Sequence, residues 1–188
     1  SYNAPEFLLS HQAIIEMSKY YDLPNWGYAG TTDAQIPDEQ AGFEAGLETF
    51  MAAMAGSNLN HDVGYMDFGR TGSLELMVIV DEVIDQVRRL ARGIPVDDEM
   101  LALDVIREAG VEGDFLTHTH TLKHLRRTQW RPRLISRMGY EEWHSAGGTS
   151  LRERSQKRLQ DILCDHQPLP IPAKQAREIQ QIVDDFAN

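Results

Sequence analysis

The sequence has one cysteine, no long apolar run and no excess of positive charge, and each absence excludes a class of protein. Cys164 alone cannot form an internal disulfide or a cysteine-ligated zinc cluster. No apolar run approaches the roughly 20 residues that a transmembrane helix needs. The net charge of −11 argues against a nucleic-acid coat protein or a basic membrane-surface protein. We therefore expect a soluble cytoplasmic protein with neither nucleic acid nor membrane as partner.

Common catalytic and targeting signatures are also missing. The sequence has no GxGxxG, GKS, GKT, GxSxG or HExxH motif. Ser1 to Glu6 contains neither a basic region nor an apolar one, so we do not expect a signal peptide. The 188 residues are near the size of one domain. They are too few for a complete (β/α)8 barrel of roughly 250 residues.

Charge is distributed unevenly along the chain. Residues 1–110 carry 19 acidic and 6 basic side chains, whereas residues 111–188 carry 10 acidic and 12 basic ones. Between Phe115 and Tyr140 there is no acidic residue, and the cations of this stretch are Lys123, Arg126, Arg127, Arg131, Arg133 and Arg137. This basic segment is either a solvated helix face paired with the acidic half or a site for an anion or partner.

Apolar residues at helical spacing predict a helix-rich chain. The expected helices cover 6–21, 38–55, 73–92, 97–110 and 150–164, with one that starts near 121 and one after the prolines of 168–172. Ser150 and Glu153 match the capping-box pattern at a helix start.

Two helical faces predict packing against a neighbour. The helix over 38–55 has a stripe of small residues, namely Ala41, Gly42, Ala45 and Gly46. Glycine lowers helix propensity, so we expect close packing as the reason for the stripe. The last helix has an apolar face and is therefore expected to dock on something.

Short strands are expected at 26–30 and 58–65, each followed by a long helix, and residues 111–120 form a loop or a short strand. Residues 69–72 read as a glycine-rich loop. This alternation favours a helix-rich α/β fold with part of a parallel sheet, and a helical bundle is the alternative.

Three groups of residues could carry chemistry. His118, His120 and His124 could form a polar site where a loop meets a helix, a weak metal site, or ordinary surface and core positions. Gly30, Thr31 and Asp33 follow a predicted strand, where α/β enzymes place ligand-binding groups. They could equally satisfy the backbone of their own loop.

The third group consists of aromatic residues that fall near the ends of the predicted strands. Its members are Trp26, Tyr28, Tyr65, Phe68 and Trp130. Aromatic faces bind desolvated cations at about 0.5–2 kcal/mol each, although a single aromatic residue is more often part of the core.

Six stretches recur together in one known family. They are residues 1–6, 30–42, 55–58, 103–113, 115–124 and 130–134. The most specific are His-Thr-Leu-Lys-His at 120–124 and Trp-Arg-Pro at 130–132. In this order they resemble the C-terminal part of the trimethylamine methyltransferase family, the corrinoid-dependent methylamine methyltransferases.

The resemblance implies that the chain is a fragment, the C-terminal portion of a (β/α)8 TIM barrel with extra C-terminal helices. Residues 1–130 would hold the last strands and helices of the barrel, and residues 131–188 a helical extension. The resemblance also implies a methyltransferase that moves a methyl group from a methylated amine to the Co(I) of a cognate corrinoid protein. No tightly bound cofactor is expected, because the partner supplies the corrinoid. We expect the fragment alone to be inactive and the protein to be a homo-oligomer.

The donor class follows from one departure. Archaeal family members carry pyrrolysine, and the position that matches it here is Gly30 or Thr31. Protonated trimethylamine is a poor methyl donor without activation, whereas a quaternary amine is always cationic and leaves as a neutral amine. The resemblance therefore favours a quaternary amine such as glycine betaine as donor.

The residues that we expect at a site fall into two sets. Expected substrate-binding residues are Tyr28, Gly30, Thr31, Asp33, Tyr65, His118 and His120, with Arg70 as a further candidate for a substrate carboxylate. Expected residues on the side of the corrinoid protein are His124, Arg126, Arg127 and Arg131. We assign no catalytic residue and no metal ligand. The alternative function is a helix-rich interaction module that binds an acidic partner through residues 123–137.

Overall fold

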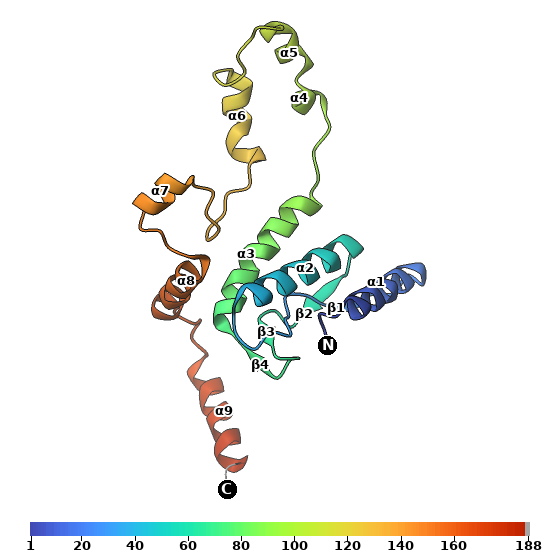
Figure 1. The fold of residues 1–188 in the computed structure, drawn as a ribbon. Coiled ribbons are helices and arrows are strands. Elements are labelled where there is room, and N and C mark those ends of the chain that lie inside the picture. The colour runs from blue at the N-terminus through green and yellow to red at the C-terminus, as the bar shows by residue number, and fades with distance from the viewer. Residues whose placement is uncertain (187–188) are drawn as a thin grey trace.

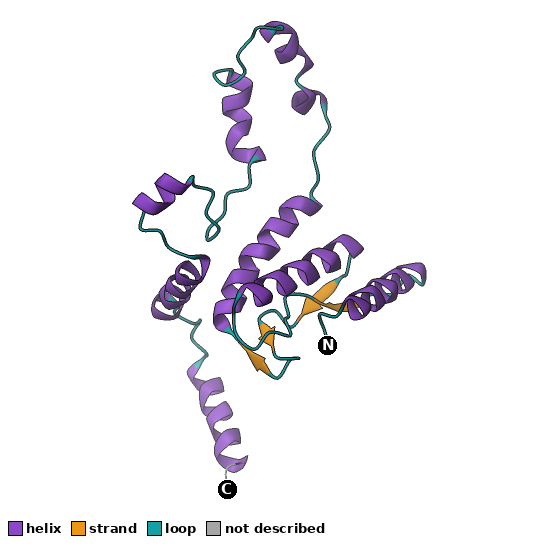
Figure 2. Ribbon diagram, in the orientation of Figure 1, coloured by secondary structure: helices purple, strands orange, loops and turns teal. Residues whose placement is uncertain are grey.

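The structure is a computed structural model that describes residues 1–186, and most of the ordered segments are helices (Figure 2). This confirms the helix-rich α/β expectation. The elements in chain order are α1 (Pro5–Tyr20), β1 (Trp26–Tyr28), α2 (Glu39–Ala55), β2 (Leu59–His61), β3 (Tyr65–Met66), β4 (Thr71–Gly72), α3 (Leu74–Ala91), α4 (Asp98–Leu101), α5 (Leu103–Ala109), α6 (Thr119–Thr128), α7 (Tyr140–Ser145), α8 (Leu151–Asp165) and α9 (Ala173–Phe186). Among the described residues, no helix combines the length and the apolarity needed to cross a membrane.

A parallel β–α–β unit forms the N-terminal half. β1 pairs in parallel with β2, with Trp26 opposite Leu59 and Tyr28 opposite His61, and α2 makes the crossover. Both strands are shorter than predicted. The second one stops because the chain turns at Asp62 and Gly64, whose φ angles are 71° and 84°. Beyond this turn β3 and β4 form an antiparallel hairpin. The expected loop at 69–72 is a turn at Gly69 and Arg70, but Thr71 and Gly72 form β4.

The main core lies where α2 crosses α3. Its members are Ala34, Ala41, Ala45, Met66, Leu76 and Val80, with Val63 and Ile84 packed against them. Burial in this core explains the two alanines of the small-residue stripe but not its two glycines. Ala41 and Ala45 are buried, but a Cβ atom on Gly42 or Gly46 would meet nothing within 4 Å, so the expectation of close packing is wrong for the two glycines.

The helix boundaries follow their local capping signals. Asp38 accepts the backbone N–H of Ala41 at the start of α2, and Ser73 accepts that of Leu76 at the start of α3. Ser150 forms the predicted capping box with Glu153. One boundary differs from its prediction. The helix expected over 97–110 breaks into α4 and α5, because Ala102 takes a left-handed conformation with a φ of 51°.

Residues 93–129 form an arm that projects beyond the end of α3 and carries α4, α5 and α6 (Figure 1). One acidic side chain fastens α4 to α6. Glu99 accepts from Lys123 and lies 3.1 Å from Nε2 of the buried His124, while its carbonyl oxygen is 2.8 Å from Nε2 of His120.

The chain returns from the arm along α3, where acidic side chains hold it. Trp130 Nε1 donates to Asp85 at 2.9 Å. Glu82 is buried and accepts the backbone N–H groups of Arg133, Leu134 and Ile135 at 2.8, 2.9 and 3.1 Å.

The C-terminal helices differ in how they pack. α8 packs against α3. α9 follows the proline-rich connector, and none of its described residues is buried. Nothing within the described residues covers its apolar face, so docking of this helix stays a prediction. Ile179, Ile182 and Val183 are all more than half exposed.

Candidate functional site

Aromatic and imidazole rings gather around Tyr28 at the carboxyl end of β1. Ring centroids of Tyr2, Phe7 and His11 lie 5.5, 5.4 and 5.7 Å from that of Tyr28. His61, at the carboxyl end of β2, lies 4.8 Å away on the same strand pair. Ring faces are the protein surfaces that attract a desolvated cation.

The parallel pairing explains why Tyr28 and His61 meet. The two residues are opposite each other in register, so their side chains project from the same end of the sheet. Trp26 also contacts the His61 ring, at a centroid distance of 5.2 Å. Carboxyl ends of parallel strands are the usual place for ligand sites in α/β proteins.

The histidines at this end have distinct surroundings. His61 Nδ1 lies 2.6 Å from Oδ1 of Asp62, which fixes the imidazole against a carboxylate. Burial, and then the nearby His61, lower the pKa of His11 below its ordinary value. Nε2 of His11 accepts the backbone N–H of Tyr28 at 3.3 Å, and Gly27 leaves it room, because a Cβ there would lie 2.4 Å from that nitrogen.

The loop after β1 is held by two glutamates of α2. Glu48 Oε2 accepts the N–H of Thr31 at 2.8 Å and its hydroxyl at 3.0 Å. Glu44 Oε2 accepts the hydroxyl of Thr32 at 2.6 Å and the N–H of Asp33 at 2.8 Å. The predicted residue Thr31 thus turns toward α2 and satisfies a buried carboxyl group.

Asp33 is engaged by the first residues of the chain. Its carboxylate accepts the Ser1 hydroxyl and the N–H groups of Tyr2 and Asn3, the latter two at 3.2 and 3.1 Å. Asp33 therefore fastens the N-terminal segment, which places the Tyr2 ring next to Tyr28. Gly30, the other predicted loop residue, has a φ of 77° and lies against Val80.

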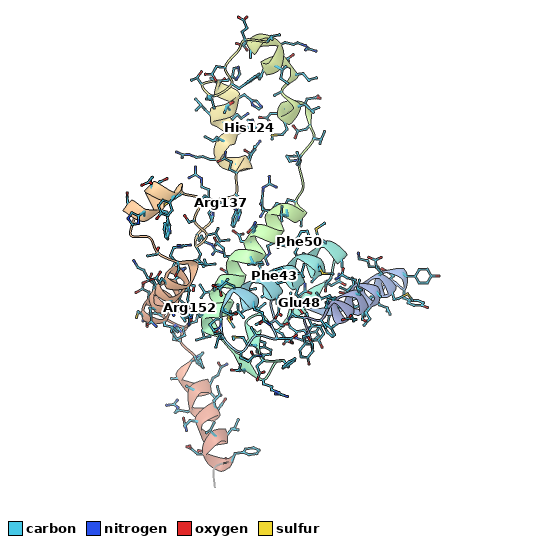
Figure 3. All side chains as sticks on the ribbon, in the orientation of Figure 1. Phe43, Glu48, Phe50, His124, Arg137 and Arg152 are labelled. Atoms are coloured by element: carbon cyan, nitrogen blue, oxygen red, sulfur yellow. The ribbon has the colours of Figure 1, made fainter. Side chains whose placement is uncertain are left out.

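Burial raises the pKa of Glu48 to about 7. The hydrogen bonds from Thr31 lower it, while the carboxylates of Asp62 and Asp33 raise it further. Glu48 is 1% exposed, and its Oε1 has no hydrogen-bond partner. In Figure 3 it lies on α2 where this helix passes the strands.

Two other predicted substrate residues lie close to this end of the sheet, in the hairpin. Tyr65 begins β3, and its carbonyl oxygen accepts the N–H of Thr32 at 3.0 Å. The Arg70 guanidinium lies over the ring of Phe68, 5.8 Å from its centroid.

The remaining predicted residues lie in or next to the arm, and within this chain they are not brought to Tyr28 (Figure 1). His118 caps α6 by accepting the N–H of His120 at 3.1 Å. The rings of His120 and His124 stack at 4.3 Å. Arg127 donates to Nδ1 of His124, while Arg126 and Arg131 are exposed. Within residues 1–186 no group of three or more His, Cys, Asp or Glu side chains is placed to hold a metal ion.

Sequence reasoning missed several residues that build this end of the sheet, namely Tyr2, Phe7, His11, Glu44, Glu48 and His61. One signal was available for the glutamates. They are carboxylates one helical turn apart in a helix otherwise rich in alanine, glycine and phenylalanine, where a buried acid needs a partner.

The chain is similar to known proteins over most of its length. A sequence model of the family described as Trimethylamine methyltransferase (MTTB) matches residues 1–186. The chain is 34% identical to a Trimethylamine methyltransferase MttB of Desulfitobacterium hafniense over 97% of its length, and 33% identical to that of Methanosarcina barkeri over 96%. A Glycine betaine methyltransferase from another strain of D. hafniense is 29% identical over 89% of the chain.

The chain spans only about a third of the length of these relatives, 36% of each trimethylamine methyltransferase and 35% of the glycine betaine enzyme. Within this span the match is nearly continuous, since the family model covers all of the described residues. The chain therefore belongs to the trimethylamine methyltransferase family.

Proposed function

We propose that this chain is part of a methyltransferase that transfers a methyl group from a methylated amine to the Co(I) of a separate corrinoid protein. The C–N bond would break, the amine would leave with the bonding electron pair, and a C–Co bond would form. Family membership supports the reaction class. The observation that carries the proposal for this chain is the ring cluster around Tyr28 at the carboxyl ends of two parallel strands.

A quaternary amine is the donor class that we propose. Its nitrogen has neither a proton nor a lone pair, so only ring faces and negative charge can recognise it. Tyr28, Trp26 and His61 supply rings, and Asp62 supplies a carboxylate beside them. The relatives include enzymes named for both donor classes, a Trimethylamine methyltransferase and a Glycine betaine methyltransferase. The chain's own residues would orient the methyl group toward cobalt and exclude water.

The chain would contribute the last strands and helices of a (β/α)8 barrel through residues 1–130, and a helical extension through residues 131–188. The parallel β1–α2–β2 unit supports this assignment because it is the repeating unit of such barrels. We expect the chain alone to be inactive, since two strands cannot enclose a barrel site.

The arm is the surface that we propose for the corrinoid protein. Arg126 and Arg131 are exposed near its base, and His124 and Arg127 lie beside them on α6. In the alternative function, a module that binds some other acidic partner, the same cations would make the contact. Replacing Arg126 and Arg131 with Glu should weaken binding of the corrinoid protein and leave methyl transfer to free cob(I)alamin unchanged. Loss of both activities would contradict the partner role.

The test of the function uses the full-length protein with reduced corrinoid protein. Glycine betaine, other quaternary amines and trimethylamine are offered separately, and methyl–cobalt formation is followed by absorbance. We expect methylation from at least one quaternary amine, and Tyr28→Leu should raise its KM by about tenfold because a ring face is lost. If no quaternary amine gives methyl–cobalt, the proposed donor class is wrong. Failure of trimethylamine as well would refute the reaction.

A further inference from the structure

Glu44 and Glu48 project from the same face of α2 because they are one helical turn apart. Each uses a single oxygen, Oε2, to accept one backbone N–H and one threonine hydroxyl from the loop that follows β1. The two glutamates therefore bind three consecutive loop residues, Thr31, Thr32 and Asp33.

We propose that Glu44 and Glu48 are positioning residues for the methyl donor: they fix loop residues 30–34 where the loop leaves Tyr28, and neither touches the donor. The inference rests on the proposed function, since it takes the carboxyl end of β1 as the donor site.

Stability alone does not account for Glu48. Its side chain is 1% exposed, and Oε1 has no partner. A buried carboxyl group with one oxygen unsatisfied costs folding free energy that an apolar side chain of similar volume would not. What this carboxyl group provides is a fixed backbone conformation in the loop.

The loop's own polar side chains are all engaged away from a ligand. Thr31 and Thr32 donate to the glutamates, and the Asp33 carboxylate holds the N-terminal segment. The backbone of Gly30 is also fixed, because its carbonyl oxygen accepts the N–H of Gly64 at 2.9 Å. The loop thus acts through its shape, and its shape depends on the two glutamates.

The ionisation of Glu48 is coupled to this arrangement. The carboxylates that face it are Asp33 on the loop and Asp62 after β2, and Glu44 lies one turn away on the same helix. Burial and these two aspartates disfavour its charged form near neutral pH. The strength of the Thr31 hydrogen bonds should therefore change in that range.

Glu82 offers a matched control. It is also a carboxyl group on a helix, 2% exposed, that accepts backbone N–H groups of a distant segment. The segment that it holds, residues 133–135, lies away from β1 beside α8. Loss of Glu82 should loosen that segment and leave the loop after β1 unchanged.

The experiment compares Glu48→Ala, Glu48→Gln and Glu82→Ala in the full-length protein by hydrogen–deuterium exchange and by donor kinetics. With Glu48→Ala we expect about tenfold faster exchange at residues 31–34 and a KM for the donor raised by about tenfold or more. With Glu48→Gln, whose amide oxygen can still accept from Thr31, KM should return to within about threefold, and the pH dependence of KM near pH 7 should disappear. With Glu82→Ala, exchange should rise only at 133–135, with KM unchanged.

Unchanged exchange at 31–34 in Glu48→Ala would overturn the positioning role, and so would faster exchange with an unchanged KM. If Glu48→Ala does not fold, Glu44→Ala takes its place with the same two readouts. If the wild-type protein transfers no methyl group, the proposed function fails and the donor role falls with it. The exchange data then still decide whether the glutamates fix the loop, so the two failures are distinguishable.

Discussion

At the scale of single residues, the carboxyl end of β1 depends on groups whose side chains face inward. Glu48, Thr31 and Asp33 satisfy one another or the backbone, and the ring of Tyr28 is left among aromatic neighbours. Recognition of a cation at this position would therefore come from the rings and from the Asp62 carboxylate, whereas Glu48 and Asp33 would act by holding the backbone.

Glu48 makes the stability of the fold depend on pH. Its pKa is about 7 in the folded chain against 4.5 as its ordinary value, so between these pH values the folded state binds the extra proton. The stabilisation that this proton provides is fully present below about pH 4.5 and is lost as pH rises from about 4.5 to about 7. Against Glu48→Gln, wild type should lose about 3 kcal/mol of unfolding free energy between pH 4 and pH 8. Urea unfolding of both proteins at the two pH values measures their free energies of unfolding. If wild type and Glu48→Gln differ by the same amount at both pH values, the prediction is wrong.

Gly30 should not tolerate a side chain. At its φ of 77° an alanine would be strained, and its Cβ would lie 2.6 Å from Cγ1 of the buried Val80. Gly30→Ala should therefore cost about 2–3 kcal/mol of unfolding free energy. Gly46→Ala is the matched control, because its Cβ meets open space in the middle of α2 and should stabilise by up to about 1 kcal/mol. Chemical denaturation of both variants checks the prediction, and equal effects would refute it.

At the scale of elements, the features that local sequence determines were predictable. Helical periodicity and capping residues are properties of neighbouring positions, so α1, α2, α3 and α8 begin and end close to their predicted limits. The left-handed turn at Ala102 and the hairpin of β3 and β4 were not predicted, because a non-glycine residue gives no local signal for positive φ. At the site, Tyr28 and the loop residues Gly30 to Asp33 were found at the expected strand end. The partners of that loop were missed because they come from a helix more than ten residues away.

The segment after Trp130 shows the same limit on prediction from local sequence, over a longer separation along the chain. Pro132 predicted an irregular backbone there, but nothing nearby indicated that Glu82, about 50 residues earlier, would satisfy three of its N–H groups. Glu82→Ala should leave these donors unsatisfied and cost about 3–5 kcal/mol, whereas Asp81→Ala, on the exposed side of α3, should cost less than about 1 kcal/mol. Thermal unfolding of the two variants, followed by circular dichroism, measures this contrast. Similar losses in both would argue against an anchoring role for Glu82.

At the scale of the whole molecule, large apolar side chains remain uncovered on several helices. On α2 they form a stripe at positions i, i+4, i+7 and i+11: Phe43, Leu47, Phe50 and Met54, which are 69, 39, 40 and 59% exposed. Phe43 and Phe50 are labelled on this helix in Figure 3. A stripe of this kind is typical of a surface that another part of a protein covers.

This stripe predicts dye binding by the chain alone. Anilinonaphthalene sulfonate should fluoresce with the wild-type chain, and the double variant Phe43→Ser and Phe50→Ser should reduce the signal by about half. Tyr140→Ser removes one exposed ring on α7 and should change the signal little. Full-length protein should bind less dye per molecule than the chain. Equal dye binding by the double variant and the wild type would show that this stripe is not the accessible apolar surface.

The arm starts and ends at the same place on the molecule. Arg89, in the last turns of α3, donates to the carbonyl oxygens of Gly93, where the arm starts, and of Thr128, where it ends, at 3.0 and 3.2 Å. Asp85, one turn earlier, holds Trp130 at 2.9 Å. A segment anchored in this way is an exchangeable insertion. Evolution could lengthen, shorten or exchange it to suit a different protein partner, and an engineer could graft another chain between Gly93 and Thr128, while the path of the chain through β1, α2, β2 and α3 stays the same.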